Sequence, residues 1–141
     1  MSYVAQTDIE ALIPSEFLTQ SLDDDGDGQA DPGVWDKVVA AVQDEIDGAL
    51  SPIYDVPFTG VIPAAVKAAT KVLTLWSLYQ RRGFHGEANP WESEAKRQRD
   101  KLEKIGNGEI ALTVDNTGFS AEGVVITETA KTFDSNGNLM A

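Results

Sequence analysis

The stretch from Pro63 to Arg82 constrains the fold most, because it is apolar on nearly every side. Its spacing predicts a helix that opens at Pro63, since proline suits the first helical position, and ends near Arg82. The large apolar residues in it are Val66, Val72, Leu73, Leu75, Trp76, Leu78 and Tyr79. A helix with so little polar surface lies at the centre of its fold or between subunits.

The segment before it predicts a second long helix over residues 32–50. Asp31 can cap this helix and Pro32 suits its first turn. One face is apolar and the other polar, as expected of a helix packed against a core. The apolar face comprises Trp35, Val38, Val39, Val42, Ile46, Ala49 and Leu50. Residues 51–62 contain two prolines and a glycine, and predict an extended connector that buries Ile53, Tyr54, Val56 and Phe58.

Two further helical segments are predicted at the ends of this region. Thr7 and Glu10 have capping-box spacing at the start of a short helix that Pro14 closes, with a second turn around Phe17. After the central helix, Asn89 is a candidate cap for a helix that Gly106 stops. Its apolar stripe is thin: Trp91, Ala95, Leu102 and Ile105. We expect the four aromatic residues Trp35, Trp76, Tyr79 and Trp91 to pack in the core.

The 141 residues suffice for one domain with a core. We predict a mostly α fold: a small helical domain of about four helices over residues 1–106, and an extended, strand-forming arm over 107–141. The arm has β-branched runs at 110–114 and 124–129 but few bulky side chains. Such a segment becomes ordered by adding strands to a partner, so we expect it to order on assembly.

The charge is divided along the chain. The net charge is −12, but residues 1–60 carry 13 acids and one base, whereas residues 61–105 carry nine bases and five acids. The chain lacks the broad positive surface that wrapping nucleic acid needs. Opposite charges on two faces suit head-to-tail self-association, although the basic stretch is explained equally well as the solvated face of a helix. The candidate interface residues are Arg81, Arg82, Lys96, Arg97 and Arg99, with Phe119 and Phe133 of the arm. A protein partner is favoured over phosphate, because the basic helix lacks interleaved aromatic residues.

Several classes of function find little support. The chain has no cysteine, no apolar run long enough for a membrane span and no signal-peptide pattern, so we expect a soluble protein that is not exported by that route. Motifs for nucleotide binding, serine hydrolysis and zinc proteolysis are missing from the sequence. Its one histidine, His85, falls in a predicted turn. We expect the chain not to be an enzyme.

The most specific local pattern is DDDGDGQAD at residues 23–31, which matches the first nine positions of a calcium loop. Alternate carboxylates would point inward at an ion, and a glycine at the sixth position permits the bend. The predicted ligands of a structural Ca²⁺ are Asp23, Asp25, Asp27, Gln29 through its carbonyl, and Asp31. The twelfth position, where a complete loop has glutamate, is Val34. Affinity should therefore be weak unless Asp36 or another segment supplies oxygen. The alternative is a solvated acidic turn.

The order of these features resembles the Mu-like phage head–tail joining family. The resemblance rests on the loop DDDGDG, the segment DEIDGALSPIYDVPF, the helix TLWSLYQRRG and the run KLEKIGNGEIAL, and it covers residues 3–112. The final residues AKTFDSNGNLMA look like the short tail of such proteins.

The resemblance implies a virion protein of the phage neck, made in the host cytoplasm. It would form a homo-oligomeric, twelve-membered adaptor ring between the portal protein and the downstream tail or stopper protein. DNA would pass through the channel without sequence-specific binding, and no membrane would be involved. The acidic helix 32–50 or the acidic loop would lie near the lumen. A free calcium-binding module that uses the loop from Asp23 to Asp31 is the alternative function.

Overall fold

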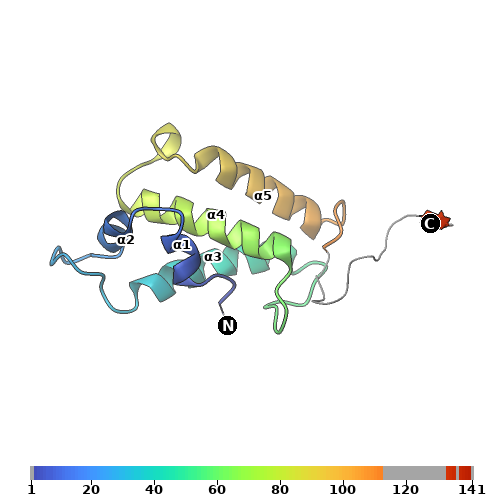
Figure 1. Cartoon of the computed structure of the whole chain (residues 1–141), viewed down its shortest axis with the longest axis horizontal. Coiled ribbons are helices and arrows are strands. Elements are labelled where there is room, and N and C mark those ends of the chain that lie inside the picture. Colours follow the sequence, from blue (N-terminus) through green and yellow to red (C-terminus); the bar gives the residue numbers. More distant parts are fainter. Residues whose placement is uncertain (1, 113–132, 136, 141) are drawn as a thin grey trace.

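The computed structural model describes residues 2–112, 133–135 and 137–140 of the chain, and this part is mostly helical, as predicted (Figure 1). In chain order its helical elements are α1 (Gln6–Glu10), α2 (Ser15–Ser21), α3 (Val34–Leu50), α4 (Ala64–Arg81), a 3₁₀ turn η1 (Gly86–Ala88) and α5 (Glu92–Gly106). Within this described part, no helix is both long enough and apolar enough to cross a membrane.

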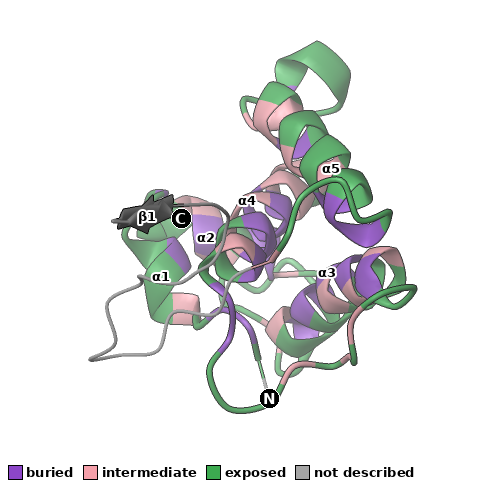
Figure 2. Cartoon of the chain, turned by 90° about the vertical axis from the view of Figure 1, so that its right-hand side faces the viewer, coloured by how far each residue is buried: buried purple, intermediate pink, exposed green. Residues whose placement is uncertain are grey.

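Helix α4 is the central element, as its apolar sequence predicts. It packs against α3 and α5 along its length and against the short helices α1 and α2 (Figures 1 and 2). Val66, Leu73, Leu75 and Leu78 are completely buried on it. The two threonines Thr70 and Thr74 of this helix are buried as well. Thr70 bonds back to the carbonyl of Val66 at 2.7 Å, whereas the Thr74 hydroxyl has no hydrogen-bond partner among the described residues.

The core divides into two clusters that share α4. The first cluster joins the ends of α3 and α5 to the start of α4, through residues that include Ile46, Leu50, Leu102 and Ile105. The second joins α1 and α2 to the start of α3 and the end of α4, through residues that include Ile9, Leu18, Leu22 and Leu78. The four aromatic residues expected in the core, Trp35, Trp76, Tyr79 and Trp91, are only half-buried and pack at its margins.

Three predicted helix caps are wrong. Helix α3 begins at Val34 after Gly33, whose φ of 84° fits glycine, and the Asp31 carboxylate accepts the amide of Asp24 at 2.7 Å instead of capping α3. Helix α1 is preceded by Ala5, whose amide donates to the Asp8 carboxylate at 3.1 Å, so the expected Thr7–Glu10 box is not formed.

Asn89 holds α5 to α4 rather than capping α5, which begins at Glu92. Its side-chain nitrogen donates to the Trp76 carbonyl at 3.0 Å and to the Gln80 side chain at 3.2 Å. Its side-chain oxygen accepts the amide of Trp91 at 2.9 Å. Since this asparagine is buried, its amide group is used for a tertiary contact.

Tyr3 fastens the segment between α3 and α4. Its hydroxyl donates to Asp47 on α3 at 2.7 Å and accepts the amide of Phe58 at 2.9 Å. Burial, together with the hydrogen bond to Asp47, raises the pKa of Tyr3 to about 12. The connector itself is only partly buried: Tyr54, Val56 and Phe58 are half-covered, and Ile53 is 50% exposed, contrary to the prediction.

Most of the predicted arm lies outside the described residues. Residues 110–112 of the first β-branched run form no strand, and the amide of Leu112 donates to the Tyr54 hydroxyl at 2.8 Å. The run at 124–129 is not described. Near the C-terminus, β1 (Phe133–Ser135) and β2 (Gly137–Met140) pair antiparallel, with Phe133 opposite Met140.

Gly106 is the last residue of α5, and close packing between helices explains why it is glycine. A Cβ at this position would lie 2.0 Å from the carbonyl oxygen of Ala49 on α3. The chain leaves the helix through Gly108, whose φ is 89°. Gly106 therefore lets two helix ends touch, in addition to ending the predicted helix.

Replacing Gly106 with alanine should destabilise the domain by about 1–3 kcal/mol, because the Ala49 backbone must move to admit a methyl group. Gly48→Ala is the matched control. Nothing lies within 4 Å of a Cβ there, so the better helix former should stabilise α3 by about 0.5–1 kcal/mol. Urea unfolding of both variants tests this; equal effects of the two substitutions would contradict the packing explanation.

Candidate functional site

The aspartate loop, residues 23–31, connects α2 to α3. It is closed by a backbone hydrogen bond from the amide of Asp31 to the carbonyl of Leu22, at 2.9 Å, and by the bond from the Asp24 amide to the Asp31 carboxylate. Gly28, at the sixth position of the calcium-loop pattern, has φ of 84°. The bend that the pattern requires is therefore present at the expected residue.

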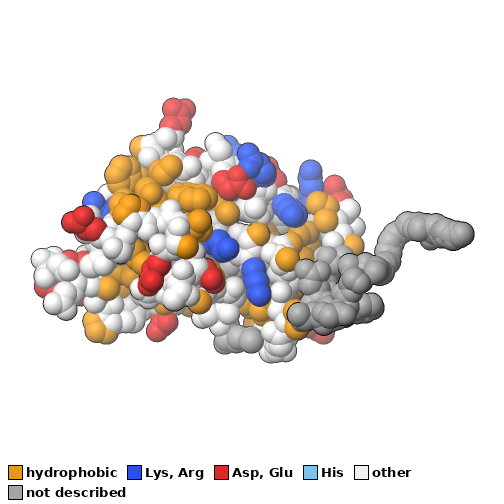
Figure 3. All heavy atoms as spheres, viewed as in Figure 1, with side chains coloured by type: hydrophobic (Ala, Val, Ile, Leu, Met, Phe, Trp, Pro, Cys, Tyr) orange, Lys and Arg blue, Asp and Glu red, His pale blue; other side chains and the backbone are white. Residues whose placement is uncertain are grey.

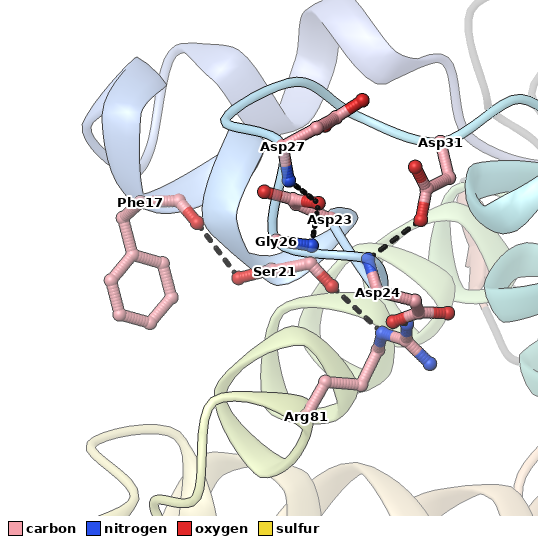
Figure 4. A network of polar contacts seen from close by, with 8 residues as sticks. All are labelled: Phe17, Ser21, Asp23, Asp24, Gly26, Asp27, Asp31 and Arg81. Atoms are coloured by element: carbon pink, nitrogen blue, oxygen red, sulfur yellow. Dashed lines mark hydrogen bonds and ion pairs between the residues drawn. The ribbon is translucent and has the colours of Figure 1, made fainter.

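The Asp23 carboxylate organises the turn from inside (Figure 4). One of its oxygens accepts the amides of Gly26 at 2.8 Å and Asp27 at 3.2 Å, and the other accepts the amide of Gly28 at 2.8 Å. Asp25 accepts the amide of Asp27 at 3.0 Å in the same way, two residues further on. These bonds allow the turn to form from its own side chains and amides.

The electrostatics of the loop are those of crowded carboxyl groups. Loss of solvent raises the pKa of Asp23, but the amides of Gly28 and Gly26 and the other hydrogen bonds outweigh it, and the pKa falls below its ordinary value. For Asp25 the amide of Asp27 lowers the pKa. Loss of solvent, the Asp23 carboxyl and the charges of Asp27 and Asp31 together outweigh that effect and raise it. A cation would relieve this repulsion.

Four of the predicted metal ligands are brought together. One carboxylate oxygen from each of Asp23, Asp25, Asp27 and Asp31 lies within 4.8 Å of all the others. Asp36 does not join this group, and Val34 at the twelfth position is buried as the first residue of α3. The cluster thus offers a hard cation oxygen ligands from one side, without the bidentate glutamate of a complete calcium loop.

Arg81 ties the aspartate loop to the end of α4 (Figure 4). Its Nε donates to the carbonyl of Ser21 at 2.8 Å, and its guanidinium forms an ion pair with Asp24. Among the residues that the structure describes, Asp24 is the one carboxylate of the loop that forms an ion pair. Arg81 was predicted as an interface residue from its charge, and the structure gives it this internal contact.

Two other predicted interface residues have internal partners too. Arg99 on α5 donates to Glu45 on α3 at 2.7 Å and lies 4.4 Å from the ring centre of Trp76, while Arg97 pairs with Glu94 on its own helix. Arg82 lies 5.2 Å over the ring of Phe17. Lys96 is exposed, Phe119 is outside the described residues, and Phe133 lies in β1. Their role in an interface stays a prediction.

A pair of lysines missed by the sequence analysis lines the side of α4. Lys67 and Lys71 border a hollow together with Trp35 of α3 and Asp8 of α1. Their spacing of four residues places both on one helical face. This spacing was the feature of the sequence from which the pair could have been predicted. The hollow itself could not be predicted, because its walls come from distant parts of the chain.

Comparison with known proteins gives one result that covers most of the chain. The family described as Bacteriophage Mu, Gp36 matches residues 3–126, which include all five α-helices and the aspartate loop. No curated protein matches the chain. The matched region extends past residue 112, where the resemblance recognised in the sequence ends. The chain belongs to the bacteriophage Mu Gp36 family and is therefore a Mu-like phage protein.

Proposed function

We propose that the chain is a structural protein of the phage neck, forming an adaptor ring between the portal and the tail through which DNA passes. The observation that carries this proposal is the family match over residues 3–126. The partners would be the portal protein, neighbouring copies in a ring of about twelve, and the downstream tail or stopper protein. Association with the virion follows from the phage family at a coarse level, and the neck position is part of the proposal.

The charge distribution supports repeated contacts between copies. The acidic residues 1–60 include α1–α3 and the aspartate loop, whereas the basic residues 61–105 include α4 and nearly all of α5. Figure 3 shows Lys and Arg side chains gathered over the central and right-hand part of one face. Surfaces of opposite charge at different places on one molecule favour a head-to-tail contact, and such contacts close into a ring when the rotation between copies permits it.

Helix α3 has the chemistry that a DNA channel wall requires. It exposes Asp36 and Asp44, its exposed Glu45 is paired with Arg99 of α5, and it bears Lys37 as its one base. A negative wall repels the phosphate backbone, so that DNA slides without binding. Facing α3 toward the lumen would also leave the apolar stripe of the helix in its present place, against α4 and α5.

Antibody labelling of purified particles should place the chain at the neck, and quantitative mass spectrometry should find about a dozen copies per particle. The two measurements answer separate questions, because the antibody label shows where in the particle the chain lies and the copy number shows the symmetry of the ring. A chain recovered only from the soluble lysate, with unlabelled particles, would contradict the neck proposal.

Deleting residues 113–141 should leave the helical domain folded but unable to assemble, because the core clusters lie within residues 3–112. Circular dichroism should show an unchanged melting temperature within a few degrees, while incorporation into particles is lost. Infectious particles in normal number from the truncated gene would show that the C-terminal arm is dispensable.

A second candidate is calcium binding by the aspartate loop, favoured by the four carboxylates that converge within 4.8 Å. We propose a structural role, in which the ion fixes the junction of α2 and α3. The missing glutamate ligand places the expected dissociation constant on the order of 10⁻⁴–10⁻³ M. The ion could act within the neck protein or, in the alternative function, in a free calcium-binding module.

The double variant D25N/D27N separates calcium binding from turn formation. Asparagine keeps the side-chain oxygen that accepts a backbone amide, but removes the charge. Calcium at about ten times the dissociation constant should raise the free energy of unfolding of the wild-type protein by about 1.4 kcal/mol, and that of the variant much less. With chelator the variant should be at least as stable as the wild type. If the wild-type protein has the same melting temperature in calcium and in chelator, the calcium proposal is wrong and the loop is a solvated acidic turn.

A further inference from the structure

A hollow beside α4 brings two lysine side chains together in a concave surface. Its volume is about 600 Å³, and its walls are the N-terminal segment, α1, α3 and α4. Lys67 and Lys71 contribute two ammonium groups one helical turn apart, and Trp35 contributes a half-buried aromatic surface. We call this feature the lysine hollow.

The ammonium group of neither lysine has a hydrogen bond or an ion pair with any residue that the structure describes, unlike the guanidinium groups of Arg81, Arg97 and Arg99. Asp8 is the one acid in the wall, and its carboxylate accepts the amide of Ala5 at the start of α1. The hollow therefore presents net positive charge within a strongly acidic chain. A site of this kind suits a compact anionic segment whose backbone can approach closely.

We propose that the lysine hollow receives the aspartate loop of a second copy of this chain. This inference rests on the proposed ring, because it identifies the contact between neighbours in it. The loop carries five aspartates in nine residues, and Asp25 and Asp27 are exposed at its tip. Gly26, Gly28 and Ala30 add almost no side-chain bulk, so the loop can enter a hollow next to a tryptophan.

The contact has to form between copies. Within one chain the aspartate loop is fastened to Arg81, in the last turn of α4, whereas Lys67 lies in the first turns. Along the helix, Arg81 is fourteen residues from Lys67 and ten from Lys71, or about 21 and 15 Å at 1.5 Å per residue. Figure 1 shows the loop projecting from the end of the molecule at which α4 finishes. Two complementary surfaces at different positions make a head-to-tail contact, the kind that a ring requires.

In the docked arrangement the aspartate loop and the acidic surface of α3 would have different roles. The loop would be used between copies, which leaves the exposed acids of α3 for the channel wall. Calcium in the loop would be compatible with docking, since five aspartates and one divalent ion retain a net negative charge. The hollow itself contributes no predicted calcium ligand, so variants of the lysines leave the metal question untouched.

Carbodiimide crosslinking tests the contact without altering the protein, because it joins a lysine amine to a carboxylate that it touches. Treated particles and purified chain should both yield peptides that link Lys67 or Lys71 to an aspartate of residues 23–31. The variant K67R/K71R keeps the charge but cannot react, and should lose these links. Links from Lys101 and Lys104 with none from Lys67 or Lys71, in both samples, would overturn the docking proposal.

Charge reversal gives a second, independent readout. The variant K67E/K71E should lower the number of copies per particle roughly tenfold, because carboxylates would then face carboxylates. The control K101E/K104E reverses two exposed lysines on α5 that form no ion pair within the described part of the chain, and it should change the copy number less than about twofold. Equal losses in both variants would overturn the assignment. Absence of the unmodified chain from particles would instead contradict the neck proposal, while crosslinking of the purified chain still decides the docking.

Discussion

Burial of α4 is the constraint on which the rest of the structure depends. Two core clusters meet on this helix, and each of the other α-helices packs against it directly or through them. Fully buried aliphatic side chains such as Val66, Leu73 and Leu78 each contribute on the order of 1.5–3 kcal/mol relative to exposure. Since α1 and α2 have five and seven residues, they are too short to be stable alone, and their positions depend on this apolar surface.

The sequence predicted the helices well because hydrophobic periodicity is a local signal. It predicted their starts poorly, since the start of a helix depends on which backbone amide a side chain reaches in three dimensions. Asp31 has the residue type of a cap, but α3 begins two residues further on than a cap at Asp31 requires, and the Asp31 carboxylate closes the loop onto Asp24. Asn89 likewise has the residue type of a cap, but it is buried against α4, where its side-chain nitrogen donates to Trp76 and Gln80.

The candidate sites also differ in whether they depend on consecutive residues or on distant parts of the chain. The aspartate loop was predictable because its carboxylates lie within nine consecutive residues, and a glycine at the sixth position sets their bend. The lysine hollow was not, because it requires Trp35, Asp8 and α4 to meet. The basic residues chosen for an interface were predicted from charge alone. The structure distinguishes Arg81 and Arg99, which hold helices and loops together, from Lys67 and Lys71, whose ammonium groups have no partner among the described residues.

The attachment of the aspartate loop to Arg81 has a geometric consequence. If the loop of one copy enters the lysine hollow of the next, both halves of the contact are attached to α4, one at its last turn and the other along its first half. A helix of 18 residues is stiff over its length, so α4 would set the distance between the two contact points and thereby the spacing of adjacent subunits. The circumference of the ring, and hence the bore of its channel, would then be encoded largely in the length of one helix.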